Sequence, residues 1–377
     1  MGSIQRLNAR SFRAYAGTQV NGKRTRKTKL FTTKREAEAW IRDIEERLHD
    51  EATGAAPPET ITVGELVNRW LASRARELRP KTIEGYEHTI NRHLLPHLGH
   101  LEVRELTPYH VQAWIDEQAA AGVGATILGH AVKRLRSALD GAVRLGLVTT
   151  NAARLATSPA PQKASYAILT KGQVEQLLAV AEADHFHPLW HLLVLAGLRR
   201  GEALGLRWRD VDLSKREIHI KQTVEVVRSR PVIGKPKTKS AIRTIAIPQT
   251  LVNALRQHKD RQTFHVTAMR TGPFAELYLD RDLVICTETG GPHNPANIYD
   301  HLAAMLERAS LPRVRVHDLR HTYASHLIAD GVPLPVVAKQ LGHASPAITM
   351  QVYAHMVPGQ QREAADAIER LFGKASV

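Results

Sequence analysis

The order of apolar and polar residues divides the chain into regions with different predicted structure. Residues 1–35 interleave apolar with basic side chains on both sides of Asn21-Gly22, which is a strong signal for a β-hairpin. Between residues 61 and 156 the apolar side chains recur at the spacing of amphipathic helices. From residue 166 onward helical patterns surround short stretches of strand-like alternation, and helices dominate beyond residue 296. Together the patterns predict a multidomain α+β fold.

A small N-terminal domain, residues 1–50, is predicted to combine a three-stranded sheet with one helix. Thr33 is a suitable cap for the helix that follows the strands, and Glu36 completes a capping box three residues later. Residues 51–60 are typical of a linker, because small residues there lead into two adjacent prolines that stiffen the chain. We therefore expect the N-terminal domain to end before this stretch.

A helical domain is predicted from residue 61 to residue 156. Thr62 is a suitable cap for its first helix, and Thr107-Pro108 opens a later one. The last helix, from residue 126 to residue 145, carries a stripe of leucine and alanine beside several basic side chains. This pattern predicts a helical unit with one buried face for each helix.

The rest of the chain, residues 166–377, is predicted to form a mixed α/β domain after a second linker at residues 157–165. Within it, residues 243–247 alternate in the strand pattern, and the stretch before them is rich in glycine, proline, serine and lysine. We interpret that stretch as the loop of a β-hairpin with strands around residues 216–228 and 242–248. Its lysines are then expected to project from the tip of the hairpin.

The chain is strongly basic, with a formal net charge of +15 over 377 residues and a pI of about 10.0. This charge favours a polyanionic partner, of which nucleic acid is the main class; a basic ribosome-like or membrane-surface protein is the alternative. No apolar run approaches the length of a membrane span, and the start of the chain lacks the pattern of a signal peptide. We therefore expect a cytoplasmic protein, associated with the nucleoid of a bacterial host and without a membrane partner.

Cysteine and histidine residues do not form a recognisable metal-binding or disulfide pattern. The single Cys286 ends a short apolar run that predicts a buried strand from residue 283 to residue 286, so we expect it to be a small core residue. A cluster of histidines has Pro188 in its midst, which interrupts helical spacing, and we predict no metal site there. The histidines in question are His185, His187 and His191.

Basic side chains are concentrated in two places that suit contacts with DNA phosphates. Residues 1–35 hold ten lysines and arginines and no acidic residue, and the last helix of the helical domain has a basic face. The alternatives are a disordered basic tail at the N-terminus and a generic helical bundle with a solvated face. The candidate DNA-binding residues are Arg6, Arg10, Arg13, Lys23, Arg24, Arg26 and Lys27 in the first region, and Lys133 and Arg134 in the second.

Histidine, arginine and tyrosine residues near the C-terminus point to chemistry on phosphate. The segment reads V-H-D-L-R-H-T-Y-A-S-H-L, then L-G-H-A-S-P, then V-Y-A-H, and it contains His317, Arg320, His343 and Tyr353. Because His317 and Arg320 are three residues apart, they share one face of a helix. Imidazole, guanidinium and phenol groups directed at one place are suited to attack on a phosphodiester.

A second arginine motif lies earlier in the chain, in the sequence G-L-R-R-G-E. Arg199 and Glu202 are three residues apart, so the carboxylate can orient the guanidinium from behind. A cationic pocket would matter for a nucleophilic tyrosine, because only about one phenol in a thousand is ionised at neutral pH. A reactive Tyr353 therefore needs neighbouring cations or a base.

In combination these motifs resemble the tyrosine recombinases of the phage-integrase type. The family pattern is an arginine in G-L-R-x-x-E, a lysine on a β-hairpin, H-x-x-R, L-G-H and a tyrosine nucleophile. The interval from His343 to Tyr353 is one residue longer than in many relatives, a variant that the family also shows. The resemblance extends to an N-terminal arm-type DNA-binding domain and a SAM-like core-binding domain. The matching catalytic positions are Arg199, Lys237, His317, Arg320, His343 and Tyr353, with Glu202 as the residue that orients Arg199.

The resemblance implies that DNA is cut by transesterification, without ATP, a metal or another cofactor. Arg199 and Arg320 would clamp the scissile phosphate, while Tyr353 would attack it to form a 3′-phosphotyrosyl bond and release a 5′-hydroxyl. His317 would act as the acid or base toward the tyrosine, and His343 would donate to the phosphate.

The resemblance assigns protonation of the departing 5′-oxygen to a lysine, because the pKa of a lysine can be lowered more readily than that of an arginine. Lys237 fits the family pattern best, because a Lys-Thr pair precedes the strand that begins at Arg243. Lys235 and Lys239 lie in the same predicted loop and stay open as alternatives.

The implied partners are double-stranded DNA with core and arm sites, a homotetramer on that DNA, and an accessory DNA-bending or directionality factor. Residues 360–372 predict a terminal helix with one apolar stripe, which can dock in cis or on a neighbouring protomer. A type IB topoisomerase-like nicking and closing enzyme is the alternative within the same chemistry. A non-catalytic DNA-binding regulator on the same scaffold is the alternative outside it.

Overall fold

The computed structural model describes most of the chain, and it divides into two compact units, residues 1–162 and residues 163–377. None of the described helices is both long enough and apolar enough to cross a membrane. The described residues are 3–8, 11–20, 23–53, 60–161, 166–273 and 275–343, together with Ser345, Ala347, Met350, Asp366 and residues 368–371.

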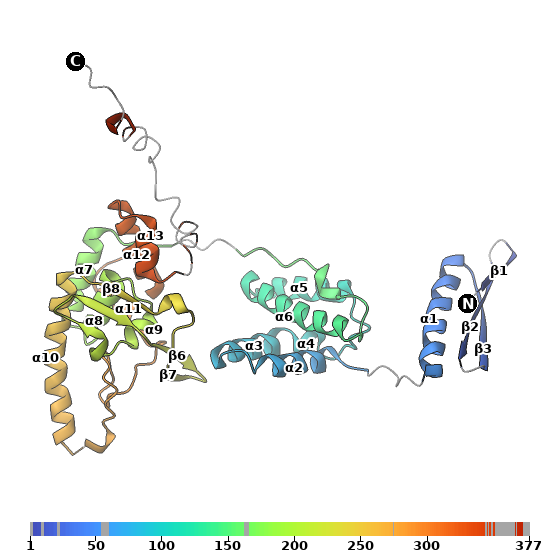
Figure 1. The fold of residues 1–377 in the computed structure, drawn as a ribbon, viewed down its shortest axis with the longest axis horizontal. Helices are drawn as coiled ribbons and strands as arrows, with labels where there is room; N and C mark the ends of the chain where they lie inside the picture. Colours follow the sequence, from blue (N-terminus) through green and yellow to red (C-terminus); the bar gives the residue numbers. More distant parts are fainter. Residues whose placement is uncertain are drawn as a thin grey trace. The chain divides into compact units, whose positions relative to one another are not determined.

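The N-terminal residues form the predicted three-stranded sheet with one helix, here called the arm domain (Figure 1). The antiparallel strands β1 (Ser3–Asn8), β2 (Ser11–Val20) and β3 (Lys23–Phe31) are adjacent in that order, and α1 (Lys34–Thr53) packs on β2. Three buried alanines, Ala14, Ala16 and Ala37, bring the helix close to the sheet. The fold class predicted for this region is confirmed.

Two details of the arm domain differ from the sequence prediction. Thr33 caps α1 as expected, because its hydroxyl accepts the Glu36 N–H at 3.2 Å, but the Glu36 carboxylate binds the Thr32 hydroxyl, 3.1 Å away. The helix also continues to Thr53, so it occupies the first three residues of the predicted linker. The predicted Asn21-Gly22 turn lies outside the described residues, although Val20 and Lys23 on either side of it are paired.

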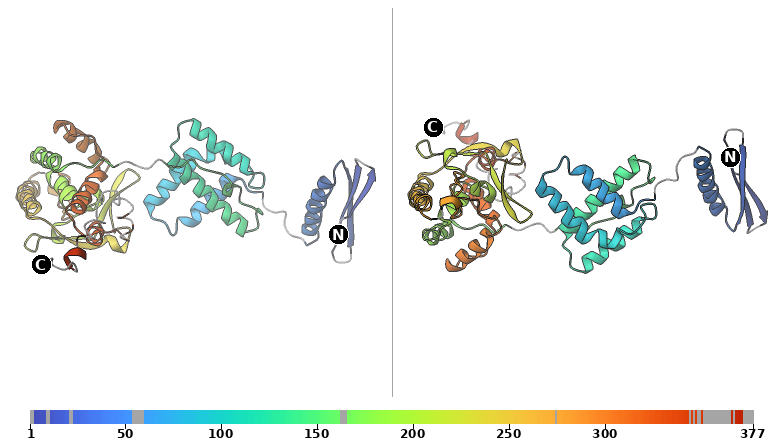
Figure 2. Two further views of the ribbon diagram at one scale, coloured as in Figure 1. Left: turned by 90° about the horizontal axis from the view of Figure 1, so that it is seen from above. Right: turned by 90° about the horizontal axis from the view of Figure 1, so that it is seen from below.

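The helical domain consists of α2 (Val63–Arg74), α3 (Pro80–His93), the short α4 (Leu95–Leu98), α5 (Pro108–Ala120) and α6 (Ala125–Arg144), followed by a 3₁₀ turn, Ala152–Arg154. Thr62 and Thr107 cap α2 and α5, as their sequence context predicts. The amphipathic α6 packs against α2 and α3 (Figure 2), and its leucines Leu135 and Leu139 are buried.

The second unit is the predicted mixed α/β domain, called the catalytic domain because the candidate catalytic residues lie in it, and its core is built around α8. That helix is buried on all sides, including the aromatic ring of Trp190. Its helices are α7 (Lys171–Ala181), α8 (His187–Leu195), α9 (Arg200–Leu204), α10 (Gln249–Thr271), α11 (Ile298–Arg308), α12 (Val316–Ala329) and α13 (Leu334–Leu341). Its strands are β4 (Val211–Asp212), β5 (Glu217–Ile220), β6 (Thr223–Val227), β7 (Arg230–Gly234) and β8 (Arg243–Ala246).

The predicted pairing of the stretch around residues 216–228 with that around residues 242–248 is found between β5 and β8, but the predicted connection between them is wrong. It is not a single hairpin loop, because β6 and β7 form a separate hairpin within it. The hairpin turn is made by Arg228 and Ser229, both at positive φ (46° and 62°). Glycine, asparagine and aspartate are the residues typical of such a turn, so the sequence carried no signal for a turn at Arg228 and Ser229. The lysines therefore lie between β7 and β8 and not at a hairpin tip.

The predicted strand at residues 283–286 is also absent; the predicted burial is confirmed for Leu283, Val284 and Ile285 and is wrong for Cys286. Val284 is buried and its N–H binds the Leu206 carbonyl at 2.8 Å, but the segment forms only an isolated bridge, between Leu283 and Arg207. Cys286 is only half-buried and its thiol accepts a hydrogen bond from Gln262 at 3.0 Å.

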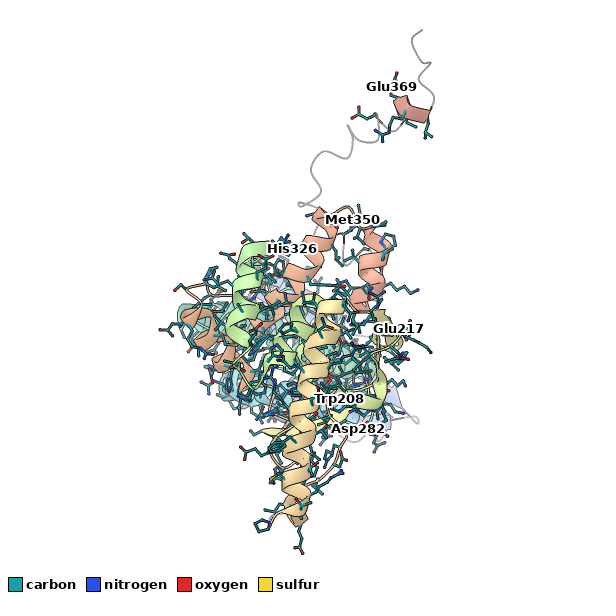
Figure 3. The ribbon with its side chains drawn as sticks, turned by 90° about the vertical axis from the view of Figure 1, so that its left-hand side faces the viewer. Trp208, Glu217, Asp282, His326, Met350 and Glu369 are labelled. Atoms are coloured by element: carbon teal, nitrogen blue, oxygen red, sulfur yellow. The ribbon has the colours of Figure 1, made fainter. Side chains whose placement is uncertain are left out.

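Trp208 holds a loop beside α10 through hydrogen bonds. The main-chain N–H of Trp208 donates to the Asp282 carbonyl at 2.9 Å, and the indole N–H of Trp208 donates to the Gln262 side chain at 2.6 Å. Both labelled residues, Trp208 and Asp282, lie beside α10 in Figure 3. These contacts fasten the middle of the long α10 to the domain, beyond its buried first turns.

Candidate active site

Arg199 is presented at the start of α9 and oriented by Glu202, as the three-residue spacing predicts. Arg199 is the N-cap residue, so it lies just before the helix and not within it. Its Nη1 donates to one carboxylate oxygen of Glu202 at 2.7 Å, while its main-chain N–H donates to the other at 2.9 Å. The side chain keeps 37% of its exposure, so part of the guanidinium faces outward.

Glu202 is buried and is shared between two arginines, only one of which was predicted. Arg243, the first residue of β8, binds both carboxylate oxygens, with Nη1 at 3.1 Å and Nη2 at 3.0 Å. Burial alone would raise the pKa of Glu202, but Arg243, then Arg199 and Arg320, lower it below its ordinary value. The carboxylate is therefore ionised at neutral pH. In the sequence, Arg243 served only to mark the start of a strand.

Arg320 lies on α12 and is buried, where it binds main-chain carbonyls and links two distant motifs. One guanidinium nitrogen donates to the Gly197 carbonyl at 2.6 Å, and another donates to the Leu341 carbonyl. Gly197 immediately precedes the Leu198-Arg199 step, and Leu341 ends α13. The predicted G-L-R-x-x-E and L-G-H motifs thus meet at Arg320.

The C-terminal turn of α13 carries His343 and is bound by three arginines. Gly342 adopts a left-handed conformation (φ 64°) that ends the helix, and the His343 N–H then donates to the Ala338 carbonyl at 3.1 Å. Helix C-termini concentrate negative partial charge on their last carbonyls, which attracts cations. The three successive carbonyls of Gln340, Leu341 and Gly342 accept hydrogen bonds from Arg243 (2.7 Å), Arg320 and Arg199 (3.3 Å), respectively.

His317 and His343 are both kept neutral, first by desolvation and then by the positive charges around them. Although His317 keeps solvent exposure, desolvation by the surrounding protein, then His321, Arg320 and Arg199, lower its pKa to about 4. For His343, burial is again the first cause, followed by Arg320, Arg199 and Arg243, and its pKa is also about 4. A neutral imidazole can accept a proton or donate one through its N–H, so both rings suit acid–base work at neutral pH.

Arg199, Arg243 and Arg320, which bind the turn before His343, are called the arginine cluster. Two other predicted catalytic residues make no described contact with this cluster. Lys237 lies in the segment between β7 and β8, exposed, and its ammonium is 3.9 Å from the Glu225 carboxylate on β6. The side chain of Lys239 lies outside the described residues, and Lys235 is exposed. Tyr353 also lies outside the described residues, so its assignment stays a prediction. The other tyrosine near these motifs, Tyr323 on α12, is half-buried beside Leu327.

The candidate DNA-binding residues of the arm domain lie on its strands as far as they are described. Arg6 extends over the ring of Phe12, 5.9 Å from its centroid, and Arg13 and Lys27 lie on β2 and β3. Lys23, Arg24 and Arg26 are in β3, but their side chains and all of Arg10 lie outside the described residues.

The two candidates on α6 differ in their surroundings. Lys133 is exposed. Arg134 is half-buried with its guanidinium 4.2 Å from the ring centroid of Tyr86, which itself stacks on Trp70. Burial lowers the pKa of Arg134. Arg134 thus contributes to packing between α6 and α3, and any contact with DNA would use the outer edge of this stack.

Two of the three clustered histidines, His187 and His191, lie on α8 in the protein interior, whereas His185 precedes the helix and is exposed. His187 and His191 are both buried, and the His191 Nδ1 is 2.9 Å from the main-chain oxygen of His187. Among the residues that the structure describes, no three His, Cys, Asp or Glu side chains are grouped as a metal site would require.

Comparison with known proteins identifies the family to which this arrangement belongs. The profile of the phage integrase family matches residues 167–359, which is just over half of the 377 residues, and that of the phage integrase N-terminal SAM-like domain matches residues 62–118. The chain belongs to the phage integrase family. It is therefore a tyrosine recombinase of the integrase type, an enzyme class that cleaves and rejoins DNA.

Individual relatives are similar over nearly their whole length. A "Tyrosine recombinase XerC-like" protein of Caldanaerobacter subterraneus is 29% identical, with 94% of each chain covered. A "Putative prophage phiRv2 integrase" of Mycobacterium tuberculosis is 25% identical, with 98% of this chain and 95% of the relative covered.

Solved structures share the fold. The Tn1549 transposon integrase, in a complex with circular-intermediate DNA, has a TM-score of 0.69 at 18% identity over 83% of this chain and all of the other. A lambda integrase dimer bound to a COC′ core site has a TM-score of 0.58 at 16% identity over 92% of this chain and 93% of the other.

Proposed function

We propose that this protein is a site-specific recombinase of a phage or integrative element, which cuts and rejoins DNA through a 3′-phosphotyrosyl bond to Tyr353. One observation carries the proposal. Arg199 and Arg320, from motifs far apart in sequence, bind adjacent carbonyls of the turn that carries His343. Two guanidinium groups and an imidazole are thereby collected at one place, which is what binding and activating a phosphodiester requires.

The two arginines are suited to different parts of the work. Arg199 is partly exposed and is oriented by Glu202, so its outward N–H groups can bind the non-bridging oxygens of a phosphate. Arg320 is buried against main-chain carbonyls, so it fixes the floor of the site and supplies positive charge. Preorganised donors of this kind each contribute about 3 kcal/mol to transition-state stabilisation in other enzymes.

Proton transfers are assigned to the remaining groups. His317 and His343 are neutral at physiological pH, so His317 can accept the phenol proton of Tyr353 while His343 donates its N–H to a phosphate oxygen. Lys237 is exposed and carried by the segment between β7 and β8, from which it would protonate the 5′-oxygen as that oxygen leaves. Lys235 and Lys239 are the alternatives for this last role.

The DNA partner is supported by the basic arm domain and by similar proteins whose structures hold DNA. The lambda integrase structure contains a core site, and the Tn1549 integrase structure contains circular-intermediate DNA. We infer that the helical domain binds core sites and the arm domain binds separate arm sites. A homotetramer, the terminal helix docked on a neighbouring protomer, and an accessory bending or directionality factor complete the proposal, with the bacterial nucleoid as the place of action.

The proposal is tested by trapping the covalent intermediate. Wild-type protein, Tyr353→Phe and Tyr323→Phe are incubated without metal with a nicked duplex that carries the attachment site, and the products are separated on a denaturing gel. Screening the flanking element DNA on a supercoiled plasmid identifies the site beforehand. The wild type and Tyr323→Phe should form a protein–DNA adduct, and Tyr353→Phe should not, because only the assigned nucleophile is lost.

Other outcomes separate the alternatives. An adduct that persists in Tyr353→Phe would reject the assigned nucleophile. A protein that binds the site but forms no adduct would be a DNA-binding regulator. Relaxation of supercoiled plasmid without exchange between two sites would indicate a topoisomerase-like enzyme.

A further inference from the structure

We propose that Arg243 is a positioning residue for strand cleavage, which holds the turn carrying His343 against the Arg199–Glu202 pair. The inference rests on the proposed function, because it concerns the geometry of the site that would bind the scissile phosphate. Arg243 opens β8 and its side chain is only 6% exposed, so the guanidinium is directed into the protein. It would not touch DNA itself and would act through the residues that it holds.

The guanidinium of Arg243 joins two elements at once. Its Nη1 and Nη2 bind the two carboxylate oxygens of Glu202 on α9, at 3.1 and 3.0 Å, while its Nε binds the Gln340 carbonyl at the end of α13, at 2.7 Å. A planar group with donors in fixed directions can bridge a carboxylate and a carbonyl in this way. A lysine ammonium is a single point of charge on a flexible stem and cannot hold both with the same geometry.

Arg243 also reaches the segment that carries the candidate lysine. Its Nη1 donates to the Ala241 carbonyl at 3.1 Å, and the Ala241 N–H in turn donates to the Thr238 carbonyl at 3.2 Å. Thr238 follows Lys237 directly in the chain. One side chain therefore connects the Arg199–Glu202 pair, the turn before His343 and the end of the lysine segment.

The turn is shaped to accept this contact. A Cβ atom at Gly342 would lie 2.9 Å from the Arg243 side chain, and the backbone there has φ 64°, which glycine adopts without strain. The close approach of Arg243 and the end of α13 therefore both depend on Gly342. This gives the glycine of the L-G-H motif a physical role, because a larger residue would push Arg243 away from Gln340.

A second buried arginine–carboxylate pair in the same domain provides a matched control. Arg207 binds Asp210 at 2.6 Å, Asp210 is buried like Glu202, and Lys221 is a second cation on it at 2.9 Å. None of these residues belongs to the arginine cluster. Arg207→Ala therefore removes one cation from a doubly paired buried carboxylate, as Arg243→Ala does, without touching the site.

The test compares full-length wild type, Arg243→Ala, Arg243→Lys and Arg207→Ala by three measurements. The first is the single-turnover cleavage rate at saturating attachment-site DNA, and the second is the affinity for that DNA. The third is hydrogen exchange of the Gly342 and His343 amides without DNA. These amides donate to Lys339 and Ala338 at 3.1 Å each, so their exchange reports opening of the turn.

In Arg243→Ala we expect the cleavage rate to fall by about 10- to 100-fold while the affinity for DNA changes by less than about 2-fold. Exchange at the two amides should become faster by at least about 10-fold. Arg243→Lys should give an intermediate rate, and Arg207→Ala should match the wild type in both the rate and the exchange at the turn.

Other results would overturn the proposed role of Arg243 or the proposed function. Cleavage by Arg243→Ala at the wild-type rate would overturn the proposal, and so would slower cleavage with unchanged exchange at the turn. Equal losses in Arg207→Ala would show that general destabilisation is the cause, which also overturns it. If the wild type forms no adduct, the proposed function fails first, and the exchange data then show only whether Arg243 holds the turn.

Discussion

Arg320 donates a hydrogen bond of 2.6 Å to the main-chain carbonyl of Gly197, the residue that begins the G-L-R-x-x-E motif. The same side chain also binds the carbonyl of Leu341, so it connects the approach to Arg199 with the turn before His343. Arg320 is therefore part of the scaffold of the site as well as a source of positive charge. Arg199 is partly exposed and contributes much less to holding these segments together.

This difference predicts unequal effects on stability. Arg320→Ala leaves two buried carbonyls without their donor, and each such loss costs about 1–3 kcal/mol, so the free energy of unfolding should fall by about 3 kcal/mol or more. Arg199→Ala leaves Glu202 paired with Arg243 and should cost about 1 kcal/mol, as partly exposed ion pairs do. Both variants should lose DNA cleavage. Urea denaturation measures the stabilities, and equal values for the two variants would contradict the scaffold role.

Much of this arrangement could be predicted because the relevant signals are local. The capping threonines, the amphipathic helices and the spacing of Arg199 to Glu202 each depend on a few neighbouring residues, and the structure confirms them. Arg243 could not be found in the same way. Its partners Glu202 and Gln340 lie on elements that come together only in the tertiary fold, and no local pattern separates it from other strand arginines.

The hairpin error has a physical origin of the same kind. The sequence prediction placed the loop where glycine, proline and lysine gather, whereas the chain turns at Arg228-Ser229. Both residues adopt positive φ, which is unfavourable for them, so the pairing of β6 with β7 imposes the turn. At Arg228-Ser229 the pairing of the two strands, and not the local turn preference of the residues, determines where the chain turns.

Gly197 is predicted to be intolerant of any side chain. Its φ is 61°, and a Cβ atom at this position would overlap the Tyr323 ring. Gly197→Ala should therefore cost about 2–4 kcal/mol, since left-handed backbone and overpacking each contribute about 1–2 kcal/mol or more. The displaced carbonyl would also weaken its bond with Arg320. Thermal or urea denaturation provides the measurement.

A matched glycine and a double mutant test the cause. A Cβ atom added at Gly172 on α7 would meet no side chain and no neighbouring element within 4 Å, so Gly172→Ala should leave stability unchanged or slightly raise it. If the Tyr323 ring is the obstacle, Gly197→Ala combined with Tyr323→Ala should cost less than the sum of the single changes. Simple additivity would point to backbone strain alone.

Buried histidines are predicted to make the catalytic domain sensitive to acid. An unfolded histidine binds a proton near pH 6.5, whereas burial, followed by the charges of His191 and Arg261, lowers the pKa of His187 to about 4. Between these values the unfolded state binds more protons, so stability should fall as the pH drops from about 6.5 to about 4. For His187 alone the loss is at most about 3 kcal/mol.

Unfolding free energies measured at several pH values check this expectation. His187→Gln should flatten the pH dependence over that range, because the group that takes up the proton on unfolding is gone. His88→Gln, at an exposed position on α3, is the control and should retain the full slope. A slope that His187→Gln leaves unchanged would assign the acid sensitivity to other groups.

The arm domain is predicted to contribute a salt-dependent part of DNA binding. Residues 1–35 contain ten basic and no acidic side chains, and the described ones, such as Arg13 and Lys27, are carried on β2 and β3. Each phosphate contact contributes about 0.9 to the slope of log affinity against log salt. Removing residues 1–53 should therefore lower both the affinity for arm-containing DNA and the steepness of that slope.

On a DNA fragment limited to the core site, the truncated and full-length proteins should give the same slope, because the arm has no site to bind there. Identical slopes on both fragments would show that the basic strands do not contact phosphates.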